Sequence, residues 1–191
     1  MRPAYNLSRT QVITQAVAAL ENGNVIAYPT EAVYGLGCDP FNPTAVEKLF
    51  SLKQRPSSKG LILIAAHRAQ IQPLIAPDQA ILWDDINNSW PGPVTWVFPA
   101  SDKVPAWISG EHHSIALRVT NHAIAHALCE AFNQPIVSTS ANPTAQAPAK
   151  TAQQIQDYFP YGIEYVVDSE CGTETKPSVI RDALTGNILR K

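Results

Sequence analysis

Residues 28–37 read Tyr-Pro-Thr-Glu-Ala-Val-Tyr-Gly-Leu-Gly, and residues 52–60, one short helix later, read Leu-Lys-Gln-Arg-Pro-Ser-Ser-Lys-Gly. The first stretch follows the short apolar run of residues 25–28 and is predicted to form a loop. In it, Gly35 and Gly37 permit backbone conformations that other residues avoid and a close approach of a ligand. The second stretch gathers three cations within seven residues: Lys53, Arg55 and Lys59. A glycine-containing loop beside a cationic cluster suits an anionic, phosphate-bearing ligand.

Each half of this pattern also has another explanation. A Gly-x-Gly sequence alone is weak, and the chain has neither a Walker A sequence nor the full G-x-G-x-x-G fingerprint. A run of Lys and Arg more often forms a solvated surface than a binding site. Taken together, the residues favour phosphate binding and a solvated surface about equally.

At these residues the chain resembles the YrdC/TsaC family, the threonylcarbamoyl-AMP synthases. The resemblance covers roughly residues 8–190 and consists of seven motifs in family order, which makes coincidence implausible. These motifs are residues 28–37, Lys53-Gln-Arg55-Pro, Lys59-Gly-Leu-Ile-Leu-Ile, Trp90-Pro-Gly-Pro-Val-Thr, Ile115-Ala-Leu-Arg118-Val, Ser138-Thr-Ser-Ala-Asn142 and Pro177-Ser178-Val-Ile.

Length and charge limit the possible classes of protein. A chain of 191 residues is most simply one domain with a sizeable core. The net charge is −2 and only 16% of the residues are charged, so general electrostatic attraction to nucleic acid is not expected. Any contact with RNA would have to come from a local basic patch.

The cysteines and the absence of long apolar stretches indicate the compartment. Cys38, Cys129 and Cys171 are odd in number and widely spaced, which fits neither a disulfide framework nor a CxxC zinc site. The N-terminus lacks an apolar signal core, and no stretch approaches a membrane span. We therefore expect a soluble cytoplasmic protein without membrane association.

Apolar patterns, caps and turn residues alternate along the chain in the way that is typical of an α/β domain. We expect the last strands to pair antiparallel, and residues 100–113 and 143–150 to be loops. Helices are predicted over residues 8–22, 42–52, 77–88, 121–132 and 151–159, and strands over 25–28, 61–66, 94–98, 114–119, 136–138, 165–167, 178–181 and 188–190. The resemblance implies one YrdC-like domain over residues 1–191, with a twisted open mixed sheet flanked by helices and a concave basic cavity.

Arg118 lies in the middle of an apolar strand and requires a partner. If Leu117 and Val119 point into the core, Arg118 points to the opposite face, where an unpaired charge would be costly. The partner is either an Asp or Glu of the protein or an anionic ligand, and the residues alone do not decide between them. Arg181 and Arg190 have similar settings.

Residues 138–142 directly follow a strand. Ligands in α/β sheets lie at the carboxyl ends of strands, so the hydroxyls and the amide of this Ser-Thr-Ser-Ala-Asn sequence can meet a ligand. The alternative is turn chemistry, because Ser, Thr and Asn also bond to their own backbone.

Other catalytic and metal-binding patterns are weak. His122 and His126 share a helical face at a spacing that can hold a metal, but a third ligand is unsupported and no metal site is predicted. His112 and His113 are expected on an exposed loop. No Ser/His/Asp triad suggests itself, and no helix bears the paired carboxylates of an acid–base hydrolase.

The resemblance implies roles for ten side chains. The threonine-binding residues would be Thr30, Arg118, Ser138 and Ser178. The ATP-binding residues would be Lys53, Arg55, Lys59, Ser140, Asn142 and Arg190, with Lys53 and Arg55 also catalytic and Mg²⁺ carried by the nucleotide. Folding should barely change when Lys53 or Arg55 is replaced, since both are expected at an exposed helix end.

The chain departs from the family at two places. The usual S-A-N-x-S-G sequence ends here in Thr144 and Ala145, and we expect that alanine cannot replace glycine at a positive φ. Some family members carry a histidine at the position of Ile64, so a threonine contact there is not carried over.

The resemblance implies a synthase that joins L-threonine, bicarbonate or CO2 and ATP into threonylcarbamoyl-AMP and releases pyrophosphate. The product would pass to a transferase complex that modifies adenosine beside the tRNA anticodon. One alternative is an RNA-binding protein that acts on rRNA or tRNA through the same basic cavity, although only Phe50 is an aromatic residue near the basic cluster. Another is the catalytic piece of a carbamoyltransferase, which is less favoured because no accompanying domain is present.

Overall fold

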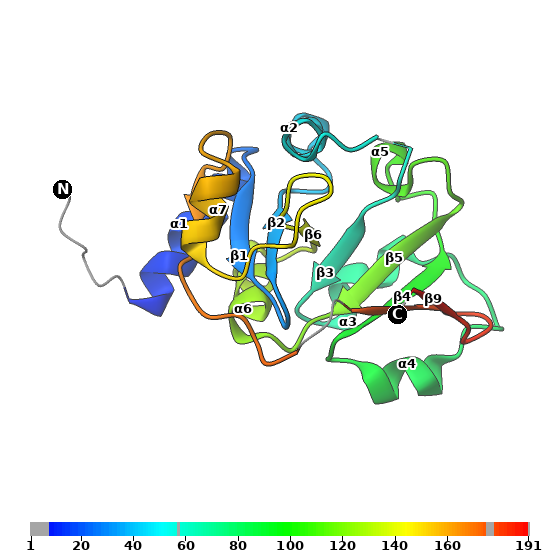
Figure 1. Cartoon of the computed structure of the whole chain (residues 1–191). Coiled ribbons are helices and arrows are strands. Elements are labelled where there is room, and N and C mark those ends of the chain that lie inside the picture. Colours follow the sequence, from blue (N-terminus) through cyan, green and yellow to red (C-terminus); the bar gives the residue numbers. More distant parts are fainter. Residues whose placement is uncertain (1–7, 57, 175–177, 191) are drawn as a thin grey trace, which may run out of the picture.

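A mixed sheet of nine strands organises the part of the chain that the computed structural model describes, residues 8–56, 58–174 and 178–190. The strand order is β7-β1-β2-β6-β3-β5-β4-β8-β9 (Figure 1). The strands are β1 Ile26–Pro29, β2 Tyr34–Gly37, β3 Ile62–Ala65, β4 Val94–Pro99, β5 Ser114–Val119, β6 Ile136–Ser140, β7 Tyr165–Val166, β8 Val179–Asp182 and β9 Ile188–Arg190.

Helices flank the sheet, which confirms the predicted α/β fold with an open mixed sheet (Figure 1). They are α1 Arg9–Glu21, α2 Pro43–Lys53, α3 Arg68–Ile71, the 3₁₀ turn η1 Gln72–Leu74, α4 Trp83–Ser89, α5 Ala106–Ser109, α6 Ala123–Phe132 and α7 Ala152–Tyr158.

Local capping starts the helices where the sequence predicts. The Ser8 hydroxyl accepts a hydrogen bond from the Gln11 amide, and the Gln11 side chain accepts one from the Ser8 amide, a complete capping box. Asn42 caps α2 with a single bond, in which its side-chain oxygen accepts from the Ala45 amide at 3.2 Å, and Pro43 lies in the first turn. These caps satisfy amides that have no partner within the helix.

Several predicted elements are wrong. α4 begins at Trp83 rather than near residue 77, α3 and η1 were not expected, and α5 lies inside the predicted loop 100–113. The prediction of antiparallel last strands holds only for β9, because β7 is parallel to β1 and β8 is parallel to β4.

The predicted loop after β1 is also wrong, because Tyr34–Gly37 forms strand β2. β2 pairs antiparallel with both β1 and β6, and neither of its glycines has a positive φ. Gly37 is required by packing, since a Cβ there would lie 2.5 Å from the Val137 carbonyl oxygen and 2.7 Å from the Tyr28 ring. The sequence Gly-x-Gly therefore lies in a strand instead of a loop, and Gly37 lets the three strands pack closely.

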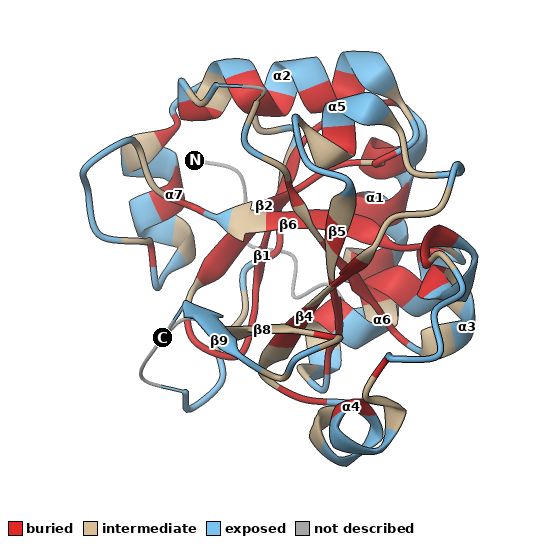
Figure 2. Ribbon diagram, turned by 90° about the vertical axis from the view of Figure 1, so that its right-hand side faces the viewer, coloured by how far each residue is buried: buried red, intermediate tan, exposed pale blue. Residues whose placement is uncertain are grey.

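The two faces of the sheet are covered to different extents. On one face, residues of four central strands belong to the larger core, as do residues of α2, α4 and α7. The strand residues are Leu36, Leu63, Trp96 and Leu117. On the other face, α1 and α6 pack over Tyr28, Ile64 and Ile136, and they contact β7, β1 and β3. Figure 2 shows buried residues along the central strands and an exposed β9 at the sheet edge. Part of the second face is thus left without a covering helix.

The helices of the described residues include none that is long and apolar enough to span a membrane.

Ala145 has a φ of +66°, so alanine does occupy the left-handed conformation that was expected to exclude it. The surrounding turn imposes this conformation. The Gln146 amide donates to the Pro143 carbonyl at 3.1 Å, and the Asn142 side-chain amide donates to the Gln146 carbonyl at 2.8 Å. An L-residue in this region carries a cost of roughly 1–2 kcal/mol, which the turn must offset.

We predict that Ala145→Gly stabilises the protein by about 0.5–1 kcal/mol, because glycine takes a positive φ without strain. For a chain of this size the midpoint of thermal unfolding should rise by roughly 1–4 °C, measured by circular dichroism. Ala147→Gly is the matched control, as Ala147 lies in the same exposed loop without a positive φ. An equal gain in the control would show that the strain at Ala145 is not the cause.

Candidate functional site

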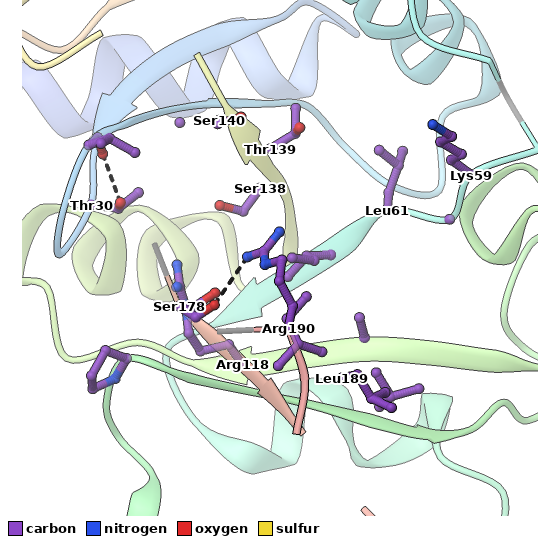
Figure 3. A pocket seen from close by; sticks show the side chains of 18 of the residues that line it. Thr30, Lys59, Leu61, Arg118, Ser138, Thr139, Ser140, Ser178, Leu189 and Arg190 are labelled. Atoms are coloured by element: carbon purple, nitrogen blue, oxygen red, sulfur yellow. Dashed lines mark hydrogen bonds between the residues drawn. The ribbon is translucent and has the colours of Figure 1, made fainter. Parts of the chain in front are cut away.

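A cavity of about 850 Å³ occupies the part of the sheet that α1 and α6 leave uncovered. Strand register places its floor residues on one face of the sheet, and these side chains are apolar: Ile62, Val97, Ala116 and Ile180. Polar side chains surround the floor (Figure 3). A largely apolar cavity with a few convergent polar groups is typical of a small-molecule site.

All four predicted threonine-binding residues line this cavity: Thr30, Arg118, Ser138 and Ser178. They come from the β1–β2 turn, from β5, from β6 and from the residue just before β8 (Figure 3). Thr30 donates its hydroxyl proton to the Val33 carbonyl at 2.7 Å, and Ser178 accepts one from Thr95 at 3.0 Å. The fold thus brings together residues that lie up to 148 positions apart in the sequence.

Arg118 forms a buried ion pair with Glu31, with 3.3 Å between Nη2 and Oε2. Glu31 also accepts a hydrogen bond from the Thr120 hydroxyl at 2.5 Å. Of the two partners that the sequence left open, the structure shows a carboxylate of the protein. The pairing is incomplete, because Arg118 Nε and Glu31 Oε2 have no hydrogen-bond partner among the described residues. Both side chains line the cavity, and these two atoms are themselves buried from solvent.

Residues 172–174 hold the turn that carries Glu31. The Gly172 amide donates to the Thr30 carbonyl at 2.9 Å, and the Glu174 amide donates to the Glu31 carbonyl at 3.0 Å. A Cβ on Gly172 would lie 2.6 Å from the Glu31 carbonyl oxygen, so only glycine permits this approach. No local pattern predicts this contact, because it joins segments about 140 residues apart.

Three further cations line the cavity: Arg55, Lys59 and Arg190. The Arg55 guanidinium donates to the Gly60 carbonyl at 2.8 Å, and the Arg190 guanidinium donates to the Ser178 carbonyl at 3.1 Å. Partial burial and then the charges of Arg118 and Arg55 lower the pKa of Arg190. These neighbouring positive charges favour an anion in the cavity, because it would relieve their repulsion.

Lys53 differs from the prediction, because it is buried instead of exposed at the helix end. Its ammonium group donates to the carbonyls of Ser140, at 2.5 Å, and Asn142, at 2.9 Å, and to the Asn142 side-chain oxygen at 3.1 Å. Burial and then the nearby charge of Arg55 lower the pKa of Lys53 to about 8. Lys53 and Asn142 lie behind the cavity wall, whereas Ser140 is part of its lining.

Among the cavity-lining residues that were not predicted as site residues are His112 and Leu189. His112 is exposed, as expected of its loop, but it also faces the cavity. Leu189 lies on the exposed strand β9, next to Arg190. Alternation within a three-residue strand is too short a signal to show which of its side chains faces a ligand.

The described residues contain no group of three or more His, Cys, Asp and Glu side chains placed to hold a metal ion. His122 Nδ1 instead accepts a 3.5 Å hydrogen bond from the Ala125 amide at the start of α6. Glu31 is the carboxylate of the cavity lining, and it is engaged by Arg118 and Thr120.

Comparison with known proteins shows that this chain has relatives that share about half of its residues. The chain is 49% identical over 179 residues to the threonylcarbamoyl-AMP synthase of Vibrio campbellii, covering 93% of this chain and 97% of that protein. It is 50% identical over 190 residues to the threonylcarbamoyl-AMP synthase of Klebsiella pneumoniae, covering 95% and 96%.

Solved structures share the fold. Sua5 of P. abyssi in complex with L-threonine superposes with a TM-score of 0.85 at 30% identity, covering 93% of this chain. This chain spans 52% of the length of that Sua5. YciO of E. coli superposes with a TM-score of 0.81 at 25% identity, covering 97% of this chain and 93% of YciO. The family model Sua5/YciO/YrdC, described as "Telomere recombination", matches residues 18–191. The chain therefore belongs to the Sua5/YciO/YrdC family.

Proposed function

We propose that this protein synthesises threonylcarbamoyl-AMP from L-threonine, bicarbonate or CO2 and ATP, and releases pyrophosphate. The observation that carries the proposal is a single cavity in which hydroxyls and Arg118 adjoin three further cations. Relatives that share about half of their residues with this chain are threonylcarbamoyl-AMP synthases, and a structural neighbour binds L-threonine.

Threonine would bind beside Arg118, at the buried edge of the cavity. The Arg118 side chain lines the cavity and supplies a positive charge there, beside Glu31. Thr30, Ser138 and Ser178 line the same cavity, and their hydroxyl groups would form hydrogen bonds with the hydroxyl of the substrate. A guanidinium and a carboxylate form strong charge-assisted bonds, which would orient the amino acid.

The phosphates of ATP would bind to Arg55, Lys59 and Arg190, whose charges face the same cavity. The nucleoside would contact Ser140 and the apolar side chains of Ile180 and Leu189, which also line the cavity. We assign Lys53 and Asn142 to this site as residues that shape its wall, since neither lines the cavity.

The chemistry requires positioning and charge neutralisation more than a protein nucleophile. The amine of threonine takes up the one-carbon unit, and an oxygen of the resulting carbamate attacks the α-phosphorus while pyrophosphate leaves. Negative charge grows on the leaving phosphates, and Arg55, Lys59 and Arg190 are placed to stabilise it. Mg²⁺ bound to the nucleotide would add further neutralisation.

The product is a mixed anhydride of a carbamate and a phosphate, a reactive acyl donor. We propose that it is handed over to a tRNA threonylcarbamoyl transferase complex in the cytoplasm. The cysteines of the described residues are unpaired thiols, which is compatible with a reducing compartment. Direct RNA binding is not favoured, because Tyr34 is the aromatic residue of the cavity lining and its hydroxyl is bonded to the backbone of residues 167–169.

The first prediction concerns the reaction itself. Purified protein with ATP, Mg²⁺, bicarbonate and L-threonine should release pyrophosphate, measured by a coupled phosphatase assay. Omission of threonine or bicarbonate should reduce the release to background. Equal release without either substrate would replace the synthase proposal with a nonspecific ATPase.

The second prediction concerns the threonine hydroxyl. Buried hydroxyls of Thr30 and Ser138 would lose a partner when valine replaces threonine, and such a polar site can discriminate by up to about 10⁴-fold. We expect kcat/KM for valine to fall well beyond the roughly 10–200-fold that a methyl-sized difference gives. Comparable values for the two amino acids would show that the pocket does not read the hydroxyl.

The third prediction concerns the cations that face the cavity. Arg55→Ala and Lys59→Ala should each remove a charge-assisted bond worth roughly 1.5–3 kcal/mol, or about ten- to a hundredfold in kcat/KM. The measurement is pyrophosphate release at several ATP concentrations, with thermal unfolding of each variant.

Lys48→Ala is the control for this pair. Lys48 belongs to the same helix as Lys53, but its ammonium donates to the Gly23 carbonyl and Asn24, away from the cavity. Its replacement should leave kcat/KM of the folded enzyme nearly unchanged. An equal loss in all three variants would indicate a diffuse positive field instead of a phosphate site.

A further inference from the structure

The segment that follows β6 is held by a closed network of side-chain hydrogen bonds centred on Lys53 and Asn142. Lys53 donates all three ammonium protons to oxygens of Ser140 and Asn142. The Asn142 side-chain NH2 group donates to the carbonyls of Pro143 and Gln146, at 3.1 and 2.8 Å. Thr144 closes the network by donating its hydroxyl proton to the Lys53 carbonyl at 3.3 Å.

The direction of each bond in this network is fixed. An ammonium group has three donors and no acceptor, so the Asn142 atom that faces Lys53 must be its oxygen. The opposite side of the Asn142 amide meets two carbonyl oxygens, which require the nitrogen. Reversal of the amide would place donors against Lys53 and acceptors against both carbonyls.

This fixed direction determines the state of Ser140. The Ser140 hydroxyl lies 2.7 Å from the Asn142 side-chain oxygen, and that oxygen can only accept. Ser140 must therefore donate its one proton to Asn142. What remains on Ser140 are lone pairs, which accept hydrogen bonds.

Ser140 is also the member of this network that lines the cavity, since Lys53, Asn142 and Thr144 lie outside the lining. An oxygen with only lone pairs to offer pairs with a donor on the ligand. The phosphate oxygens of ATP are acceptors without protons at neutral pH. A phosphate next to Ser140 would thus face an oxygen that cannot donate to it.

We propose that Ser140 accepts a hydrogen bond from the nucleoside half of the nucleotide, a ribose hydroxyl or the adenine amino group, and that Lys53 and Asn142 are the positioning residues that hold it in this state. The inference rests on the proposed function, because it names the part of ATP that Ser140 meets. It differs from the expectation that Lys53, Ser140 and Asn142 all contact ATP directly.

The location of Ser140 agrees with this assignment. Ser138 and Ser140 lie on the same face of β6, but Ser138 is buried near Thr30, whereas Ser140 is exposed at the end of the strand. The amino acid would occupy the buried part of the cavity, which leaves the outer part beside Ser140 to the larger nucleoside. The cations for the phosphates come from other segments, around residues 55–59 and 190.

The test compares ligands in which one donor at a time is missing. Binding of ATP, 2′-deoxy-ATP, 3′-deoxy-ATP, purine riboside triphosphate and inorganic tripolyphosphate is measured by calorimetry for the wild type and Ser140→Ala. We expect Ser140→Ala to weaken ATP about three- to tenfold, the size of one neutral hydrogen bond. The analogue that lacks the donor read by Ser140 should bind to the wild type about three- to tenfold more weakly than ATP does. Ser140→Ala should bind this analogue and ATP with equal affinity. Tripolyphosphate should bind equally to both proteins.

Lys53→Met tests the positioning role, with Lys48→Met as its matched control on the same helix. Both lysines hold neutral oxygens, but only Lys53 orients Asn142 and Ser140. Lys53→Met should lose discrimination between ATP and the same analogue, and Lys48→Met should keep it. If Lys53→Met does not fold, the comparison of Ser140→Ala with the wild type still decides the role of Ser140.

Two results would overturn the inference. Equal weakening of tripolyphosphate and ATP by Ser140→Ala would place a phosphate at Ser140. If Ser140→Ala distinguished ATP from each analogue as strongly as the wild type does, Ser140 would not accept a hydrogen bond from any of these donors. If the wild type releases pyrophosphate under either result, only this inference fails, whereas a wild type that binds no nucleotide overturns the proposed function as well.

Discussion

The buried ion pair between Arg118 and Glu31 is the constraint on which the arrangement of the site depends. Removal of two charges from water is costly, and the loss of one partner from such a pair typically costs about 3–5 kcal/mol. The pair joins the β1–β2 turn to the middle of β5, and residues 172–174 fix the same turn from outside. Three segments distant in sequence are thereby held at the edge of one cavity. Because both side chains also line the cavity, the ion pair that stabilises this edge places a guanidinium beside the space for a ligand.

A second buried charge shapes the opposite wall by different means. Lys53 has no carboxylate partner, and backbone and amide oxygens hold its ammonium group instead. The two charges therefore differ in their place: Arg118 lines the cavity, whereas all three donors of the Lys53 ammonium group are bonded to oxygens of the protein. The cationic character of the site then comes from the side chains that remain partly free, Arg55, Lys59 and Arg190.

Much of the fold could be predicted from the sequence, because local signals determine it. The caps at Ser8 and Asn42 and the apolar runs of β3 and β5 depend on neighbouring residues only. Strand β2 could not be predicted, since its glycines are typical of a loop and its strand character comes from pairing with β6, about a hundred residues later. The burial of Lys53 has the same cause: its partners Ser140 and Asn142 lie 87 and 89 residues away. Family motifs marked residues that line the cavity, such as Ser178, but also Lys53 and Asn142, which do not line it, and no motif marked His112 or Leu189.

The uneven covering of the sheet has a consequence for how such a protein can change over time. The core between the sheet and α2, α4 and α7 provides close packing through Leu63, Trp96 and Leu117, while the neighbouring residues Ile62, Val97 and Ala116 on the same strands point the other way. Alternation along each strand thus assigns adjacent residues to separate tasks, one to folding and the next to recognition. Substitutions at the cavity floor can reshape the pocket without opening the core, so the scaffold can acquire a new specificity while its folding stays under independent selection.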